Sequence, residues 1–349
     1  MLGHIASGAS SLLKRSLEDG LADEVASWLW PVLFLQFVGF FPILLLVSYT
    51  FGSLFPALAI VEDDTAPPSY QALSLGDGDV EEGGEARNEP AESDRPITSS
   101  LRSVYKLVKS IAGWRSLFRG LAPLLVATGA TNILHGIIAA PFHSLGSFNM
   151  LAAVPSYLAL VQLHTVWLHV VITPSNPLPF YRRLPPFGKT LRATALPFAL
   201  YAVTLVIAKS IWLAVFSAVN HGETTAHIGL FTSLIPLAFV LWITLVLPAY
   251  IALLRIQASL LPPDEDPIVP FDRSFGGRVT PVLSVGEDAG KDEKTYATLG
   301  DVWATLSRPA IWRVAKLVLK ATGIYLGVTS TLGLVAFGTA VLGGVKFGF

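Results

Sequence analysis

The stretch that decides the fold runs from Leu121 to Tyr181 and reads LAPLLVATGATNILHGIIAAPFHSLGSFNMLAAVPSYLALVQLHTVWLHVVITPSNPLPFY. It contains no Asp, Glu, Lys or Arg. A helix needs about 20 apolar residues to cross a bilayer, so this stretch is long enough for two crossings. Its middle, from Pro141 to Phe148, holds the Pro, Ser and Gly residues that are typical of a turn. We therefore predict two membrane-spanning helices joined by a tight turn.

Further apolar stretches with almost no charge lie on both sides of this one. Val25–Val61, Thr224–Leu254 and Ala321–Val345 contain no Asp, Glu, Lys or Arg, and Ala193–Val219 contains only Lys209. The sequence therefore predicts an all-α integral membrane protein with an N-terminal tail at 1–26 and a six-helix membrane domain at 27–349. The six predicted spans lie at about 27–60, 121–142, 149–173, 193–219, 227–254 and 321–345. The first is longer than one crossing needs, and one kinked helix or two short segments divided at Phe40-Phe41-Pro42 are both open interpretations.

The composition agrees with a membrane protein and excludes several other classes. Of the 349 residues, 52% are hydrophobic and 14% are charged, whereas a soluble protein carries about 25% charged residues. The chain has no cysteine, which excludes disulfides and thiolate chemistry. Its net charge of −1 excludes a basic nucleic-acid binder. The predicted partner is the lipid bilayer, with other membrane proteins as further candidates.

The basic residues lie mostly in every second connection between the predicted spans. The three long loops carry 19 Lys and Arg residues, whereas the two tails and the two short turns carry 3. The positive-inside rule places the long loops in the cytosol, or in the matrix of a mitochondrion. We predict a disordered acidic insertion at 63–95 and a long polar loop at 259–298. Because the acidic residues cluster in such loops, we expect no fixed pair of carboxylates that could act in catalysis.

The alternation of long loops and spans indicates internal repetition. Apolar residues recur at helical spacing at 101–111, after the first loop, and again at 299–306, after the third, which predicts two short amphipathic surface helices. Each is followed by an aromatic–basic pair, Phe118-Arg119 and Trp312-Arg313. The two pairs lie 194 residues apart, which corresponds to two units of about 97 residues. The unit between them is shorter, and its surface helix is weak.

In this layout the chain resembles the mitochondrial carrier family, in which each of three repeats holds two spanning helices and a short surface helix. Two local motifs carry the resemblance. The stretch from Ala112 to Gly120 is similar to the family's acid-Gly-x-x-x-x-aromatic-basic-Gly motif, and its matching residues are Gly113, Phe118, Arg119 and Gly120. The stretch from Pro248 to Gln257 is similar to the family's Pro-x-acid-x-x-basic-x-basic signature, and its matching residues are Pro248, Arg255 and Gln257. The resemblance implies six helices in three two-helix repeats and a mitochondrial membrane, inner or outer.

The motif positions that differ are the ones that carry charge in the family. Ala112 replaces the acid of the first motif, and Tyr250 and Leu253 replace the acid and the first base of the second. In the third span, Gln162 stands where the proline would be. In the family, the charges of the signature form a ring of ion pairs that closes one gate of an alternating-access cycle. The resemblance therefore implies a degenerate carrier without the usual gated exchange, of the kind that acts in membrane fusion, lipid handling or protein insertion.

Polar side chains within the predicted spans are candidates for contact with a substrate, because such residues are costly in a bilayer. They are Asn132, His135, Gln162, His169, Lys209 and Arg255. These residues either line a water-accessible cavity or form hydrogen bonds with neighbouring helices, and Arg255 can alternatively reach the lipid headgroups. In the sixth span, Gly323 and Gly327 are predicted helix-packing positions.

The sequence contains no motif typical of catalysis or of metal or cofactor binding, neither His-Glu-x-x-His nor Gly-x-x-x-x-Gly-Lys. We expect a non-enzymatic membrane protein without a cofactor or metal, which acts as an adaptor, a scaffold or a groove-type conduit. One alternative is a solute transporter for an apolar or amphiphilic anion that Lys209 and Arg255 would bind. Another is a six-helix membrane anchor or lipid-binding protein unrelated to carriers. The sequence does not define a substrate, an organelle or an oligomeric state.

Overall fold

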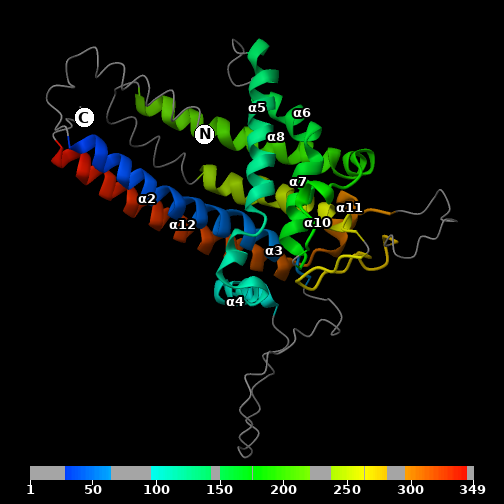
Figure 1. Ribbon diagram of the computed structural model, residues 1–349. Coiled ribbons are helices and arrows are strands. Elements are labelled where there is room, and N and C mark those ends of the chain that lie inside the picture. The colour runs from blue at the N-terminus through cyan, green and yellow to red at the C-terminus, as the bar shows by residue number, and fades with distance from the viewer. Residues whose placement is uncertain are drawn as a thin grey trace, which may run out of the picture. The chain divides into compact units, whose positions relative to one another are not determined.

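The computed structural model describes residues 28–63, 96–142, 150–174, 176–220, 237–262, 264–280 and 295–343 (Figure 1). The predicted tail at 1–26 and all of the predicted acidic insertion except Asp63 lie outside these residues. The described part of the chain contains helices and no strand, which confirms the all-α class.

The helical elements follow one another along the whole chain. In order they are α2 (Leu29–Tyr49), η2 (Thr50–Leu54), α3 (Phe55–Val61), η5 (Ile97–Ser99), α4 (Leu101–Ala112), η6 (Gly113–Phe118), α5 (Leu121–Ala139), α6 (Ala153–Ala159), α7 (Val161–Ile172), η8 (Phe180–Arg182), α8 (Phe187–Asn220), η9 (Trp242–Val246), α10 (Leu247–Ser259), α11 (Leu299–Thr305) and α12 (Arg308–Leu342).

Among the described residues, five helices are long and apolar enough to cross a membrane, or six if one bent pair counts as a single span. The five are Leu29–Val61, Leu121–Phe142, Phe187–Ile211, Leu237–Ser259 and Arg308–Leu342. The bent pair, Met150–Ala159 and Val161–Ile172, turns by 68° and is the third span in chain order. Each overlaps one of the six predicted spans, as expected of a multi-pass membrane protein. The first is one continuous helix, so the predicted alternative of a division at Phe40-Phe41-Pro42 is wrong.

The first, third and fifth spans each depart from regular α-helix at an equivalent point. The departure comes two residues before Pro56, Gln162 and Pro248, respectively. The wide π-helical turns η2 and η9 end two residues before Pro56 and Pro248. Proline lacks an N–H group and its ring clashes with the carbonyl four residues earlier, so a widened turn before it relieves that clash. In the third span the bend comes at Leu160, two residues before Gln162. Seven residues after these three positions stand Asp63, His169 and Arg255.

Two helices begin earlier than the charge-free stretches predicted. Helix α8 begins at Phe187 rather than near residue 193, and α12 begins at Arg308 rather than near residue 321. The added turns of α12 are amphipathic, because Ala310, Val314 and Leu317 are buried at helical spacing whereas Trp312, Lys316 and Leu319 are exposed. A search for charge-free sequence finds the apolar part of such a helix and misses its amphipathic extension.

Short surface helices form over both segments where the sequence predicted them. Helix α4 buries Val104 and Val108 while its basic residues stay outside, and the Ser100 side chain caps its first turn by accepting a hydrogen bond from the Ser103 N–H. Helix α11 begins with a capping box between Thr298 and Asp301. In the middle of the chain only the three-residue turn η8 forms, which agrees with the weak periodicity there.

The chain forms two units, which are described separately. The smaller unit contains the chain up to Gly52 and from Lys320 onwards, and the larger unit runs from Ser53 to Leu319. In the smaller unit, α2 and the second part of α12 lie side by side (Figure 1). The 21 residues of α2 span about 32 Å at 1.5 Å per residue, close to the roughly 30 Å thickness of a bilayer's hydrocarbon core.

The core of the larger unit lies where α3, α7 and α10 meet, since each of these three helices contacts the other two. All seven residues of α3 are buried, as are eleven of the thirteen residues of α10. Helix α8 packs against α10, α6 and α7, and α5 packs against α6 and α7. The C-terminal ends of the first, third and fifth spans are therefore held together and covered by the rest of this unit.

Candidate functional site

One of the deeply buried charged side chains is Arg255, at the C-terminal end of the fifth span. It is 1% exposed and is the largest of the fully buried side chains. Its Nη2 donates to Oδ1 of Asp63 at 2.5 Å, and its Nη1 lies 3.4 Å from the carbonyl oxygen of Ile60. This ion pair joins the end of the fifth span to the end of the first. Asp63, which the sequence analysis placed at the start of the disordered insertion, instead follows α3 directly and is held in this ion pair.

A segment of the third long loop covers this ion pair. The rings of Phe271 and Phe275 both lie 5.7 Å from the Arg255 guanidinium, on which they contribute cation–π attraction. The Asp63 backbone N–H donates to the carbonyl oxygen of Pro270 at 2.9 Å, and Oδ2 of Asp63 accepts a 2.9 Å hydrogen bond from the Asp272 N–H. We call residues 270–277 the covering segment. It is anchored through both the backbone and the side chain of Asp63.

Asp272 fixes the conformation of the covering segment. Its Oδ1 accepts hydrogen bonds from the N–H and hydroxyl of Ser274, and its Oδ2 accepts one from the Gly276 N–H. Partial burial raises the pKa of Asp272, but these hydrogen bonds and the charge of Arg255 outweigh that effect and leave the pKa below its ordinary value. Gly276 and Gly277 have φ angles of 66° and 79°, which glycine adopts without strain. The turn is therefore built to present its two phenylalanines to Arg255.

A second buried carboxylate, Glu62, joins the first span to the sixth and to the end of the first loop. It is 1% exposed. It accepts hydrogen bonds from the backbone N–H groups of Ile97 and Thr98 at 2.6 and 2.9 Å, and from the Thr98 hydroxyl at 2.5 Å. Arg313 Nη1 lies 3.5 Å from Glu62 Oε2, and its Nη2 donates to the Glu62 carbonyl oxygen at 2.8 Å. The carboxylate is thus fully compensated despite its burial.

The third span is joined to the fifth by hydrogen bonds between neutral groups and by one ion pair beyond their ends. His169 Nε2 lies 2.9 Å from the Gln257 carbonyl oxygen, and Gln257 Nε2 donates to the Thr165 hydroxyl at 3.2 Å. Beyond α10, Glu265 accepts two hydrogen bonds from Arg183, at 3.1 Å from Nε and 2.6 Å from Nη2. Arg183 Nη2 also donates to the Thr173 hydroxyl at 3.0 Å.

One type of link recurs three times among these contacts. An arginine that leads into or begins an even-numbered span reaches the C-terminal end of an odd-numbered span. Arg119, before the second span, donates to the Val170 carbonyl oxygen of the third at 2.7 Å. Arg183 precedes the fourth span and binds Glu265 after the fifth, and Arg313 in the sixth binds Glu62 after the first. We call these links, together with the Arg255–Asp63 pair, the closing network.

The closing network neutralises charge and holds helix ends together. Its arginines are paired with carboxylates or carbonyl oxygens, and Asp63 and Glu62 accept hydrogen bonds from backbone N–H groups as well. Within the described residues, no group of three or more His, Asp or Glu side chains is arranged to hold a metal ion. The arrangement is that of a structural closure, with charges paired in place and covered by a folded loop.

The structure divides the predicted cavity-lining residues. Arg255 belongs to the closing network, and His169 lies beside the Gln257 carbonyl oxygen; both are buried. Gln162 donates to the Pro185 carbonyl oxygen at 2.6 Å. These three therefore take the alternative role of bonding between segments. Lys209 and Asn132 are exposed on α8 and α5. His135 is partly buried, and its Nδ1 has no hydrogen-bond partner among the described residues.

The residues of the first predicted motif form one connected turn between α4 and α5. Gly113 ends α4 with a φ of 64°, and Gly120 precedes α5 with a φ of 78°. Phe118 packs edge-on against Trp114, with ring centroids 6.0 Å apart, and Arg119 reaches the third span. In the second motif, Pro248 begins α10, and Arg255 and Gln257 make the contacts described above. Both motifs thus occupy structural positions at helix junctions.

The predicted packing role of Gly323 and Gly327 is not what the structure shows. Both glycines are exposed on α12, and no side chain of the described residues lies within 4 Å of where a Cβ atom would stand. The close approach occurs instead at Gly343, where the Leu29 side chain lies 2.7 Å from that position. The small-residue spacing predicted a tight helix contact, but the described residues of the smaller unit form no such contact at these two glycines.

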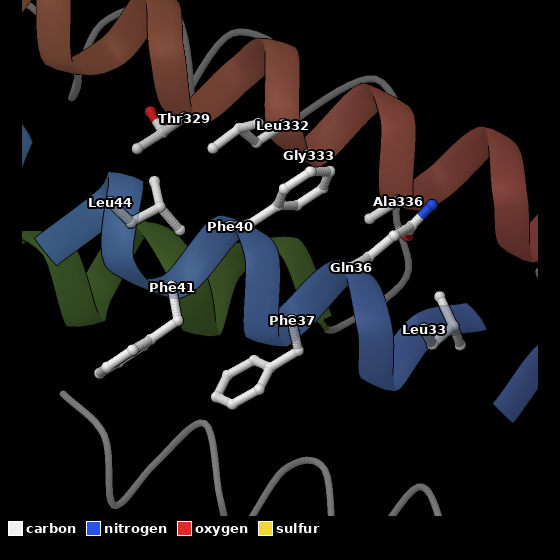
Figure 2. A pocket seen from close by; sticks show the side chains of 10 residues that line it. All are labelled: Leu33, Gln36, Phe37, Phe40, Phe41, Leu44, Thr329, Leu332, Gly333 and Ala336. Carbon is white, nitrogen blue, oxygen red and sulfur yellow. The ribbon is translucent and has the colours of Figure 1, made fainter. Parts of the chain in front are cut away.

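An apolar groove of about 310 Å³ lies between α2 and α12 in the smaller unit (Figure 2). Its lining residues are Leu33, Gln36, Phe37, Phe40, Phe41, Leu44, Thr329, Leu332, Gly333 and Ala336. Figure 2 shows Phe40 reaching towards Gly333, whereas Phe37 and Phe41 point away from α12. Phe37 and Phe41 are 63% and 48% exposed, so the groove opens to the outside of the smaller unit.

No family model, no curated protein and no solved structure matches this chain. The groups that the sequence analysis missed are Glu62, Asp63, Arg183 and Glu265, together with the covering segment. One signal was available for Asp63, which follows Pro56 by seven residues just as Arg255 follows Pro248 by seven. The covering segment had no such signal, because its role depends on a contact between distant parts of the chain.

Proposed function

We propose that this protein is a non-enzymatic, degenerate carrier-type membrane protein that acts as a scaffold or adaptor rather than as a gated exchanger. The observation that carries the proposal is the Arg255–Asp63 pair beneath the covering segment. An alternating-access cycle must separate the ends of its odd-numbered helices once per turnover. Here that separation would expose two buried charges and also detach a folded loop.

The cost of such an opening argues for a static role. Breaking a buried ion pair typically costs about 3–5 kcal/mol when one partner is left uncompensated. Opening would also break the hydrogen bonds that Glu62 accepts from Ile97 and Thr98, which tie the first loop to the same helix end. Each of these interactions is present in the closed state and lost in the open state, so the closed state is strongly favoured.

The pattern of the arginine links supports the carrier-type part of the proposal. The second span is linked to the third, the fourth to the fifth and the sixth to the first. This cyclic order is what three two-helix repeats around a common axis would produce. The interruptions two residues before Pro56, Gln162 and Pro248 support the same repeat. A mitochondrial location belongs to this proposal, because it rests on the resemblance to carriers.

The surface helices on the side of the long loops are the proposed contacts for a partner protein. Trp114, which follows α4, is 64% exposed, and Trp303 on α11 is 43% exposed. Lys109 lies in the last turn of α4, five residues before Trp114 in the chain, and tryptophan is enriched among the residues that carry binding energy at interfaces. A membrane protein partner with an acidic, partly apolar surface would fit this chemistry.

Site-specific photocrosslinking in native membranes, combined with uptake into vesicles, tests the proposal. A photoreactive phenylalanine at Trp114 or Trp303 should give one discrete protein adduct, and the same probe at Ile133, 68% exposed on α5, is the matched control and should give lipid adducts. Purified protein in liposomes should show no saturable solute uptake. Saturable uptake that Lys209→Ala reduces, without a discrete adduct at either tryptophan, would replace the scaffold with the transporter alternative.

One observation favours a second function, that of a lipid-binding membrane protein. The groove between α2 and α12 is apolar and has a volume at the lower end of the range for small-molecule sites. The transporter alternative gains less from the structure, because Arg255 is already paired with Asp63 and only Lys209 of its two proposed anion ligands is exposed.

A further inference from the structure

The groove in the smaller unit has walls made almost wholly of hydrocarbon. Only two of its lining residues are polar, and both are engaged with the protein. Gln36 Nε2 donates to the Thr339 hydroxyl at 2.7 Å, and the Thr329 hydroxyl donates to the Tyr325 carbonyl oxygen at 2.9 Å. The Gln36 Oε1 atom is covered by protein and therefore out of reach of a ligand. A ligand that fits these walls has no need of a polar group inside the groove.

The position of the groove along α2 relates it to one leaflet of a bilayer. Trp28 and Trp30, at the start of α2, are 48% and 56% exposed. Exposed tryptophans at the end of an apolar helix are typical of the membrane–water interface. The groove begins at Leu33, about one turn further into the membrane, and ends at Leu44. At 1.5 Å per residue, Leu33 to Leu44 spans about 17 Å, close to the roughly 15 Å depth of one leaflet's hydrocarbon.

The two walls differ in shape. On α12 the wall includes two small residues, Gly333 and Ala336. The position above Gly333 is empty, since no atom lies within 4 Å of where its Cβ would be. On α2, Phe40 reaches towards Gly333, whereas Phe37 and Phe41 point away from α12 and are exposed (Figure 2). The result is an apolar groove that runs between the two helices.

From these features we propose that the groove binds one acyl chain of a bilayer phospholipid. The headgroup of that lipid lies at the level of Trp28 and Trp30, and its chain runs along α2 from Leu33 towards Leu44. Dispersion contacts between the acyl chain and the groove, including its phenylalanines on α2, replace the contacts that this acyl chain would make with neighbouring lipids. An acyl chain held against the protein is less mobile than the lipids around it. This inference is independent of the proposed scaffold role.

Photolabelling by a lipid tests the inference on the full-length protein. We would reconstitute the protein in phosphatidylcholine vesicles that contain a trace of phosphatidylcholine with a photoreactive group at the end of one acyl chain. After irradiation, mass spectrometry of peptides would locate the adducts. They should concentrate between Phe37 and Leu44 on α2 and between Thr329 and Ala336 on α12.

Two variants make the labelling pattern decisive. Gly333→Leu fills the groove, and Gly327→Leu adds the same bulk on the same helix outside it, at a position that is equally free of neighbours. Gly333→Leu should lower labelling between Phe37 and Leu44 by about tenfold, the change expected when two methylene groups are excluded. Gly327→Leu should leave it unchanged. Ala336→Phe serves as a second filling variant in case Gly333→Leu does not fold.

Three outcomes would overturn the assignment. The first is uniform labelling of all lipid-exposed residues. The second is an equal effect of Gly333→Leu and Gly327→Leu. The third is selective labelling of the groove by a photoreactive sterol, or crosslinking of the groove to a second copy of the chain, because either result would identify a different occupant.

Discussion

Replacement of Asp63 by leucine tests the ion pair that joins the ends of the first and fifth spans. In the wild-type protein, Arg255 is 1% exposed and donates to Asp63 at 2.5 Å. After Asp63→Leu, the guanidinium would keep only a 3.4 Å contact with the Ile60 carbonyl oxygen and the faces of Phe271 and Phe275. Because a buried charge without its partner is not compensated, we expect the free energy of unfolding to fall by about 3–5 kcal/mol.

A double-mutant cycle separates the ion pair from the other contacts of both residues. Arg255→Met alone should cost slightly less than Asp63→Leu, about 3 kcal/mol, because the Asp63 side chain is 12% exposed and water can partly solvate it. The double variant should cost only about 1 kcal/mol, mainly for the Asp272 N–H that loses its acceptor. The two single changes should therefore be strongly non-additive.

The measurement is reversible unfolding in mixed micelles, followed by the fluorescence of the 8 tryptophans. The matched control is Asp266→Ala, which removes the exposed partner of Arg273, 3.7 Å away and 80% exposed. That change should alter the unfolding free energy by less than about 0.5 kcal/mol. If Asp63→Leu cost no more than this control, or if the double variant cost the sum of the two single ones, the reasoning about the buried pair would be refuted.

Three further predictions follow from particular contacts. Glu62→Gln should cost about 1–3 kcal/mol and should speed hydrogen exchange at the Ile97 and Thr98 amides, whose acceptor it weakens; unchanged exchange there would contradict the role given to Glu62. Gly120→Ala should destabilise by about 1–2 kcal/mol because of its φ of 78°, whereas Gly129→Ala, inside α5 with no atom within 4 Å of its Cβ position, should be neutral or stabilising by up to about 1 kcal/mol. Because the pKa of Asp272 is lowered below its ordinary 3.8 in the folded state, its stabilising effect is present at neutral pH and lost as the pH falls below that value. The protection factor of the Gly276 amide against hydrogen exchange should fall only in that acidic range, and a fall already near pH 6 would count against it.

The sequence predicted the spans well because the property that defines them is local. A run without charged residues, such as that from Leu121 to Tyr181, is visible without knowledge of any contact. The helix starts at Phe187 and Arg308 were missed because amphipathic turns outside the membrane tolerate charges such as Lys189 and Arg313.

The closing network could not be predicted in the same way, because it depends on pairs such as Asp63 with Arg255, which are 192 residues apart. A count of charges assigned Asp63 to a disordered loop, whereas packing of α3 against α10 brings it to Arg255. Tyr250 and Leu253 stand where the carrier signature has charges, and from this the sequence analysis inferred a missing ring of ion pairs. That reading did not anticipate a different pairing two residues beyond Leu253, at Arg255.

The most direct test of the closed, static state is a distance measurement across the closing network in liposomes. The chain contains no cysteine, so Ser100→Cys and Asp264→Cys introduce two unique spin-label sites. Both positions are exposed. Ser100 follows the two residues that Glu62 binds, and Asp264 follows α10. Pulsed electron paramagnetic resonance should give one narrow distance distribution that Asp63→Leu broadens. Two well-separated populations in the otherwise wild-type chain would show that these ends open and close, and would contradict the account.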